Sequence, residues 1–193
     1  MIAKIEAKHQ KYVDPKLTME LWRMKIKDQA FYYHLKLADK QNGLDSPIIK
    51  ALWELKHLIN DENLDRLEEI IAENGWPKRS AVGSSAAQTV FLIIQHADLE
   101  TQKKYLPAMK EAANEKEASW SSLALLIDRI EMREGRPQIY GSQISRDKDG
   151  TYKVFEIIDP EYVDQRREEV GLPPLEGYVK NWGITWEVEQ KTK

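Results

Sequence analysis

His96 is the residue of this sequence best suited to acid–base chemistry. It follows the apolar run 90–94 and precedes Asp98, so we expect it at the end of a buried helix. Imidazole titrates near neutral pH, and a half-buried histidine can therefore act as a general base or acid. The alternative is a histidine that only satisfies a backbone carbonyl at a helix C-terminus, where the helix dipole favours a cation.

Asp128 and Arg129 are adjacent charges at the end of the apolar stretch 123–127. Successive helical residues point about 100° apart, so the two charges do not simply pair with each other. We predict that Asp128 orients His96, as the acid does in a catalytic triad, and that Arg129 holds charge on a substrate. The alternative is a charge pair that fastens the helix to the segment 138–143.

A polar and aromatic segment follows Gly135. On a strand, Gln138, Tyr140 and Ser142 would share one face and offer amide, phenol and hydroxyl groups to an uncharged ligand such as an amide, sugar or base. Alternatively, the amides satisfy carbonyls left open at the end of the preceding helix. The predicted substrate-binding residues are Gln95, Gln138, Tyr140 and Gln143.

Two further motifs have a structural and a functional interpretation. The segment Gly83-Ser84-Ser85 precedes a helix whose free N–H groups can hold an anion, although capping alone explains the serines, and 85–88 fits a capping box. Arg166-Arg167 can grip a carboxylate or phosphate, or can be surface charge. We predict neither a metal nor a cofactor, because the four histidines are far apart in the sequence: His9, His34, His57 and His96.

The composition excludes several classes of function. The 193 residues include no cysteine, so thiolate catalysis, disulfides and cysteine-ligated metals are excluded. A net charge of −3 does not suggest a nucleic-acid or membrane-surface partner, which leaves a small molecule or peptide as the expected ligand. No apolar run spans a bilayer and the N-terminus lacks the apolar core of a signal peptide, so we expect a cytoplasmic protein unless a leader has been removed.

Helical periodicity and cap residues dominate the first two thirds of the chain. In the first helix the expected inward stripe includes Leu21, Ile26, Ala30, Tyr33 and Leu37, and in the second it is Ile48, Leu52, Leu55 and Ile59. We expect a loop over 75–84, a central buried fourth helix, and a kink or break at Pro107. The six expected helices cover about 18–40, 47–58, 63–73, 84–96, 99–114 and 118–133.

The remaining third changes character. Residues 138–145 and 151–157 are strand-like and flank an Asp-Gly turn, and a short helix is expected from Asp159 to about Val170. The predicted fold is mainly α, a bundle-like domain of six to seven helices with a small C-terminal β-hairpin. The predicted organisation is an N-terminal arm (1–17), one globular helical domain (18–186) and a C-terminal tail (187–193).

Several short motifs together resemble an uncharacterised bacterial family, the domain of unknown function 6624. This chain has Ser142 where the family usually has threonine, and Phe31-Tyr32-Tyr33 after Asp28-Gln29, where the family often has an arginine. The resemblance covers roughly residues 20–182 and implies which residues belong together, but no activity. The motifs are 75–77, 82–83, Gln95-His96-Ala97-Asp98, 126–129, Gly135 with Gln138, 140–143, 159–161, Asp164, 166–167 and 170–175.

The polar residues gathered among apolar helices favour a functional site, because buried polar groups cost stability. Our first hypothesis is a small hydrolase or group-transfer enzyme, acting on an amide or glycosidic type of bond, with His96 as general base. The second is a non-enzymatic binding or immunity-type partner-recognition module. A third possibility is a purely structural role for the cluster.

Overall fold

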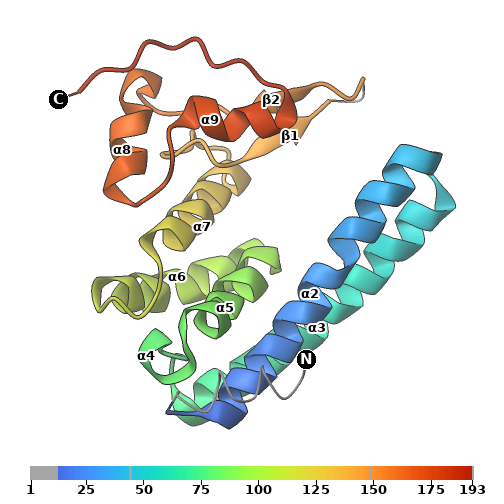
Figure 1. The fold of residues 1–193 in the computed structure, drawn as a ribbon, viewed down its shortest axis with the longest axis vertical. Helices are drawn as coiled ribbons and strands as arrows, with labels where there is room; N and C mark the ends of the chain where they lie inside the picture. The colour runs from blue at the N-terminus through green and yellow to red at the C-terminus, as the bar shows by residue number, and fades with distance from the viewer. Residues whose placement is uncertain (1–12, 44, 148, 193) are drawn as a thin grey trace.

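The computed structural model describes residues 13–43, 45–147 and 149–192, apart from the side chain of Tyr33. The fold is mainly α-helical with one small antiparallel hairpin near the C-terminus, which confirms the predicted class (Figure 1). Most of the predicted N-terminal arm lies outside the described residues. Its last residues, from Pro15, already belong to the first described helix. Among the described residues no helix is at once long and apolar enough to span a bilayer.

Two long helices, α2 (Pro15–Asn42) and α3 (Pro47–Asn74), lie side by side as a hairpin (Figure 1). Each begins with a proline after a residue whose side chain accepts a backbone N–H, Asp14 for α2 and Ser46 for α3. The sequence predicted two helices where α3 is continuous. No glycine or proline interrupts residues 48–74, and Asn63 does not cap a new helix because its amide donates to the carbonyl of Met24 on α2.

The predicted inward stripes of these two helices are partly wrong. Ile26 is 62% exposed and Ile48 is 52% exposed, whereas Leu21 is fully buried as expected. The face of the hairpin that packs inward instead includes the charged residues Asp28 and Lys56, each 1% exposed. Apolar periodicity pointed to the wrong face because this ion pair occupies the buried one.

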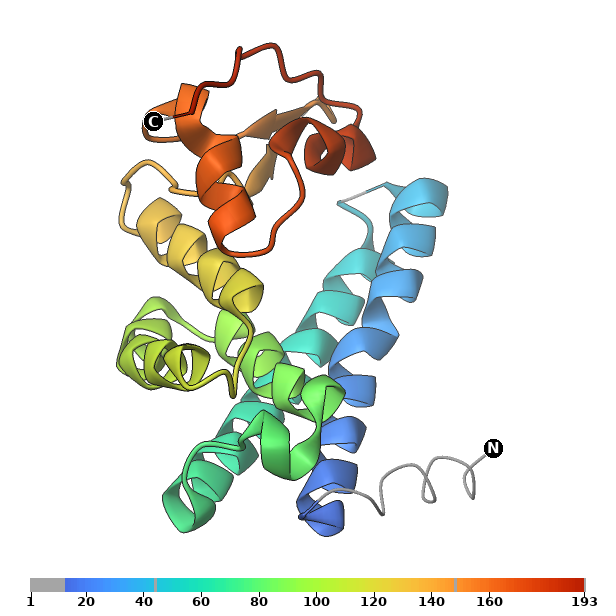
Figure 2. The same ribbon diagram turned by 60° about the vertical axis from the view of Figure 1, so that its left-hand side comes forward.

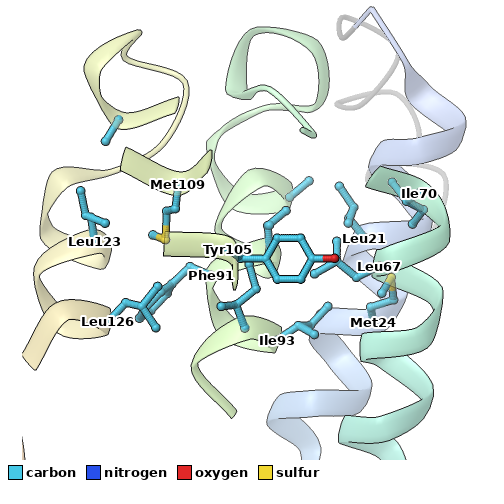
Figure 3. Packing of buried hydrophobic residues seen from close by; sticks show 14 of the residues in the cluster. Leu21, Met24, Leu67, Ile70, Phe91, Ile93, Tyr105, Met109, Leu123 and Leu126 are labelled. Atoms are coloured by element: carbon cyan, nitrogen blue, oxygen red, sulfur yellow. The ribbon is translucent and has the colours of Figure 1, made fainter. Parts of the chain in front are cut away.

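The main core is built around α5 (Ser84–His96), as predicted for the central fourth helix. Val90 and Ile94 on α5 are fully buried between the α2–α3 hairpin and α6 (Leu99–Asn114) and α7 (Trp120–Arg133). Figure 3 shows Phe91 and Ile93 of this helix among side chains from both sides. The predicted loop before α5 contains one short helix, α4 (Arg79–Val82), and Pro107 lies within α6 without ending it.

The segment after α7 gathers beyond the end of that helix (Figure 2). Strands β1 (Ile144–Arg146) and β2 (Tyr152–Val154) pair antiparallel with Ser145 opposite Lys153, so the predicted hairpin is confirmed but both strands are shorter. Four short helical elements follow: the helices α8 (Val163–Glu169) and α9 (Leu175–Val179), and 3-10 turns at Pro160–Tyr162 and Lys180–Trp182. A second apolar cluster holds this part together: Ile157, Val163, Leu175 and Val179.

Candidate functional site

Asp28 is a buried carboxylate where α2 meets α3 and α5. Its Oδ1 accepts hydrogen bonds from Lys56 Nζ at 2.5 Å and His96 Nδ1 at 2.8 Å, and its Oδ2 accepts one from Gln29 Nε2. Burial by itself raises the pKa of Asp28, but the hydrogen bond and charge of His96, with hydrogen bonds from Lys56 and Gln29, outweigh it. The pKa therefore lies below its ordinary value, and Asp28 is ionised at neutral pH.

His96 connects this carboxylate to a phenol. An ionised carboxylate only accepts hydrogen bonds, so Nδ1 of His96 carries the proton shared with Asp28. In the neutral imidazole Nε2 then accepts, and the Tyr32 hydroxyl lies 2.9 Å from it. Both ring nitrogens thus bind side chains of α2, so a histidine that serves only a helix carbonyl is not what the structure shows.

Tyr32 carries this chain of hydrogen bonds to the surface. The His96 side chain is 11% exposed and Asp28 is 1% exposed, whereas Tyr32 is 44% exposed. Burial and the charge of Asp28 raise the pKa of Tyr32, although Arg129 acts in the opposite direction. The phenol therefore keeps its proton at neutral pH and donates it to the imidazole.

Arg129 lies beside this chain, because it binds the backbone of Gln95, the residue before His96. Its Nε donates to Gln143 Oε1 at 3.1 Å, and its Nη1 donates to the backbone carbonyl of Gln95 at 2.9 Å. Among the described residues no carboxylate pairs with Arg129, and its Nη2 has no hydrogen-bond acceptor. Two hydrogen bonds consequently hold the guanidinium in place, and its Nη2 remains as a donor without a described acceptor.

Asp128 does not orient His96, contrary to the prediction. The side chain is fully buried in α7, where Oδ1 accepts the backbone N–H groups of Ile139 and Tyr140 and Oδ2 accepts that of Ser142. Burial raises the pKa of Asp128, and these amides only partly oppose the rise. Because Asp128 binds the amides of 139–142, these residues form a loop around it and not the predicted strand.

The predicted uncharged-ligand face is also wrong, because its polar groups bind one another. Gln138 is fully buried, and its amide accepts from Gln143 N at 2.7 Å and donates to Phe155 O at 2.9 Å. Tyr140 is half-buried near Asp128 and Arg166, and among the described residues the side-chain hydrogen bonds of His96 go to Asp28 and Tyr32 instead. The structure therefore brings Arg129, Gln143 and the carbonyl of Gln95 towards His96, and leaves Asp128, Gln138 and Tyr140 in the loop framework.

Comparison with known proteins places the chain in a family. A family model for a family of unknown function, DUF6624, matches residues 15–189, nearly the whole chain. The chain belongs to this family. No curated protein and no solved structure matches it, so the DUF6624 assignment brings no activity with it. Within the described part of this DUF6624 chain, no group of three or more His, Asp or Glu side chains is placed to hold a metal ion.

Three residues of the site in this DUF6624 chain were missed as site residues: Asp28, Tyr32 and Lys56. Asp28 was noticed only as part of the family resemblance, and Tyr32 only as a departure from it. Lys56 gave no signal, because a lysine in a helix is usually solvated. Its ammonium is instead buried, bound to Asp28 and to Asn60 Oδ1 at 2.7 Å. No sequence pattern links Lys56 on α3 with Asp28, which lies 28 positions earlier in the chain.

Proposed function

We propose that this protein is a small hydrolase or group-transfer enzyme that uses His96 as its general base on an anionic substrate. The observation that supports the proposal is the chain Asp28–His96–Tyr32, which runs from a buried carboxylate to a half-exposed phenol. Three groups in this order fix one tautomer of the imidazole and stabilise the imidazolium that forms when it takes a proton. The predicted acid–base role of His96 is kept, with Asp28 in the place we had given to Asp128.

The proton path follows from the hydrogen bonds. A water or hydroxyl nucleophile at the Tyr32 oxygen gives its proton to that oxygen while the phenol proton passes to His96 Nε2. Asp28 stabilises the resulting imidazolium, and the reverse transfer protonates the leaving group. Tyr32 is thus a proton relay and not the nucleophile, because its raised pKa disfavours the phenolate.

Arg129 supports an anionic substrate over the uncharged one that the sequence suggested. Its guanidinium is oriented by Gln143 and Gln95 and keeps its Nη2 donor without a described acceptor, which suits one oxygen of a carboxylate or phosphate. An anionic oxygen of the substrate bound to Arg129 would lie close to Tyr32, because the charge of Arg129 acts on the pKa of Tyr32. The bound anion and the proton relay would then be neighbours.

Hydrolysis of three chromogenic esters tests the proposal: p-nitrophenyl phosphate, the succinate half-ester of p-nitrophenol, and the uncharged p-nitrophenyl acetate. We expect turnover of an anionic ester, with His96→Gln slower by about 10²- to 10⁴-fold and Arg129→Gln losing the preference over the acetate. The matched control is His57→Gln, which changes an exposed histidine on α3. No turnover of any ester, or equal turnover by His96→Gln, contradicts the proposal.

A second candidate is the partner-recognition module. It is favoured by the exposed apolar side chains of the hairpin, among them Ile48, Leu55 and Leu58, which are 52%, 49% and 60% exposed. Such a function needs this surface and no proton transfer. Leu55→Ser with Leu58→Ser would abolish it, whereas His96→Gln would leave it intact, which is the reverse of the enzymatic expectation.

A further inference from the structure

A second site candidate lies apart from His96, where α5 and α7 begin. A cavity of about 490 Å³ opens there, a volume typical of small-molecule sites. Trp76, Phe91 and Met109 form its apolar wall, and Figure 3 shows Phe91 and Met109 on neighbouring helices. Its lining includes no residue of the Asp28–His96–Tyr32 chain and not Arg129.

Both helices that begin at this cavity lack side-chain caps. The N-caps are Gly83 for the 13-residue α5 and Ser119 for the 14-residue α7, and neither has a side-chain cap hydrogen bond. The predicted capping box at 85–88 is therefore wrong. Ser85 Oγ and Gln88 Oε1 instead accept hydrogen bonds from Lys25 Nζ at 3.2 and 2.9 Å. The first-turn N–H groups stay available and carry the positive end of each helix dipole.

Ser122 provides an independent sign of a ligand. It lies in the first turn of α7, is only 7% exposed and lines the cavity. Its hydroxyl has no hydrogen-bond partner among the described residues, whereas the nearby hydroxyls of Ser119 and Ser121 bind each other at 2.6 Å. The hydroxyl oxygen is not sealed from solvent, so it is open to the cavity and available to a ligand that enters it.

The charges around the cavity indicate the sign of that ligand. Arg79 lines the cavity without a hydrogen bond or ion pair to any described residue, and Lys25 binds two other lining residues, Ser85 and Gln88. One carboxylate, Glu117, also lines it, but its two oxygens accept the N–H and hydroxyl of Ser80, each at 2.8 Å. Glu117 is therefore already bound by Ser80, while Arg79, whose charge lowers the pKa of Glu117, keeps its N–H donors available to a ligand.

We propose that this cavity binds a small organic anion in which a phosphate or carboxylate group is joined to an apolar, preferably aromatic, body. The anionic group would lie between the two helix N-termini, with Arg79 and Ser122 as its side-chain partners. The body would pack against Trp76, Phe91 and Met109. This site is independent of the proposed reaction at His96.

Calorimetric titration of the full chain with phenyl phosphate tests the proposal, with phenol and inorganic phosphate as the two part-ligands. We expect phenyl phosphate to bind at least about tenfold more tightly than either part. Arg79→Gln and Ser122→Ala should each weaken its binding by about tenfold, since each removes one hydrogen bond to a charged group. Arg23→Gln, which changes an exposed arginine on α2 away from the cavity, should bind like the wild type.

The melting temperature provides a second readout. Ser122→Ala should leave it unchanged or slightly raised without ligand, because the hydroxyl has no partner to lose. A clear fall would mean that Ser122 is structural and would overturn the proposal. So would no binding of phenyl phosphate at about 1 mM, or binding that Arg79→Gln leaves unchanged.

Discussion

Asp28 and Asp128 are both buried aspartates on helices, and they differ in what binds them. The carboxylate of Asp28 accepts hydrogen bonds from three side chains, on α2, α3 and α5. That of Asp128 accepts three backbone N–H groups from a single loop. The first arrangement leads through an imidazole to a half-exposed phenol, whereas the second ends at the loop it holds.

The two aspartates also differ in the direction in which the fold shifts their pKa. A histidine and a lysine lower the pKa of Asp28 despite its burial, whereas burial raises the pKa of Asp128 against three amides. Titratable partners can exchange a proton with a substrate, and backbone amides cannot. The kind of partner, more than burial, distinguishes a carboxylate suited to chemistry from one that supports a fold.

The largest expected effect is on turnover by Asp28→Asn. This change keeps the shape but lets the amide bind either tautomer of His96, so kcat should fall about 10²- to 10⁴-fold. Steady-state kinetics on the ester that the wild type hydrolyses would measure it. Asp128→Asn is the matched control and should keep kcat at temperatures where it is folded. A similar fall in kcat in both variants would contradict the different roles assigned to Asp28 and Asp128.

The second effect is on stability. Asp128→Ala leaves three loop N–H groups without an acceptor and should lower the free energy of unfolding by about 3 kcal/mol. Urea unfolding followed by circular dichroism would measure it, with kcat unchanged below the transition. A loss under about 1 kcal/mol would show that the loop does not depend on this carboxylate.

Tyr32→Phe is expected to have a moderate effect. It removes the hydroxyl and keeps the ring, so a relay role predicts a fall in kcat of about 10- to 100-fold with little change in melting temperature. Tyr140→Phe, in the Asp128 region, should leave kcat unchanged. If Tyr32→Phe keeps or raises kcat, the phenol only covers the imidazole, and water reaches His96 directly.

The smallest effect is the pH dependence of stability. The pKa of Asp28 is lower in the folded state than its unfolded-state value of about 3.9, so ionised Asp28 stabilises the fold at pH values above about 3.9. This stabilisation is lost as the pH falls through the folded-state pKa. The pKa of Asp128 is shifted in the opposite direction, because it is higher in the folded state. The contribution of Asp128 to the free energy of unfolding therefore falls as the pH rises from the unfolded-state pKa through the folded-state pKa. Urea unfolding of wild type, Asp28→Asn and Asp128→Asn between about pH 3 and 6 would compare the slopes. Parallel slopes for the two variants would contradict this assignment.

Local signals in the sequence were enough for most of the helices and for part of the site. Asp98 caps α6, whose bounds Leu99–Asn114 agree with the prediction, and the apolar run 90–94 placed His96 at the end of a central helix. The same reasoning pointed to Arg129. These signals act between residues within a few positions of each other, where capping and periodicity operate.

Only the tertiary structure decided which charges meet. His96 and Asp28 are 68 positions apart, and Lys56 comes from a third helix, so their contact depends on how α2, α3 and α5 pack against one another. The sequence suggested Asp128 as the partner of His96, but the loop amides of 139–142 compete for it locally and bind it. Composition and spacing determined which residue types were available for chemistry. The assignment of partners came from packing, because a buried charge pairs with whatever donor the fold brings within reach.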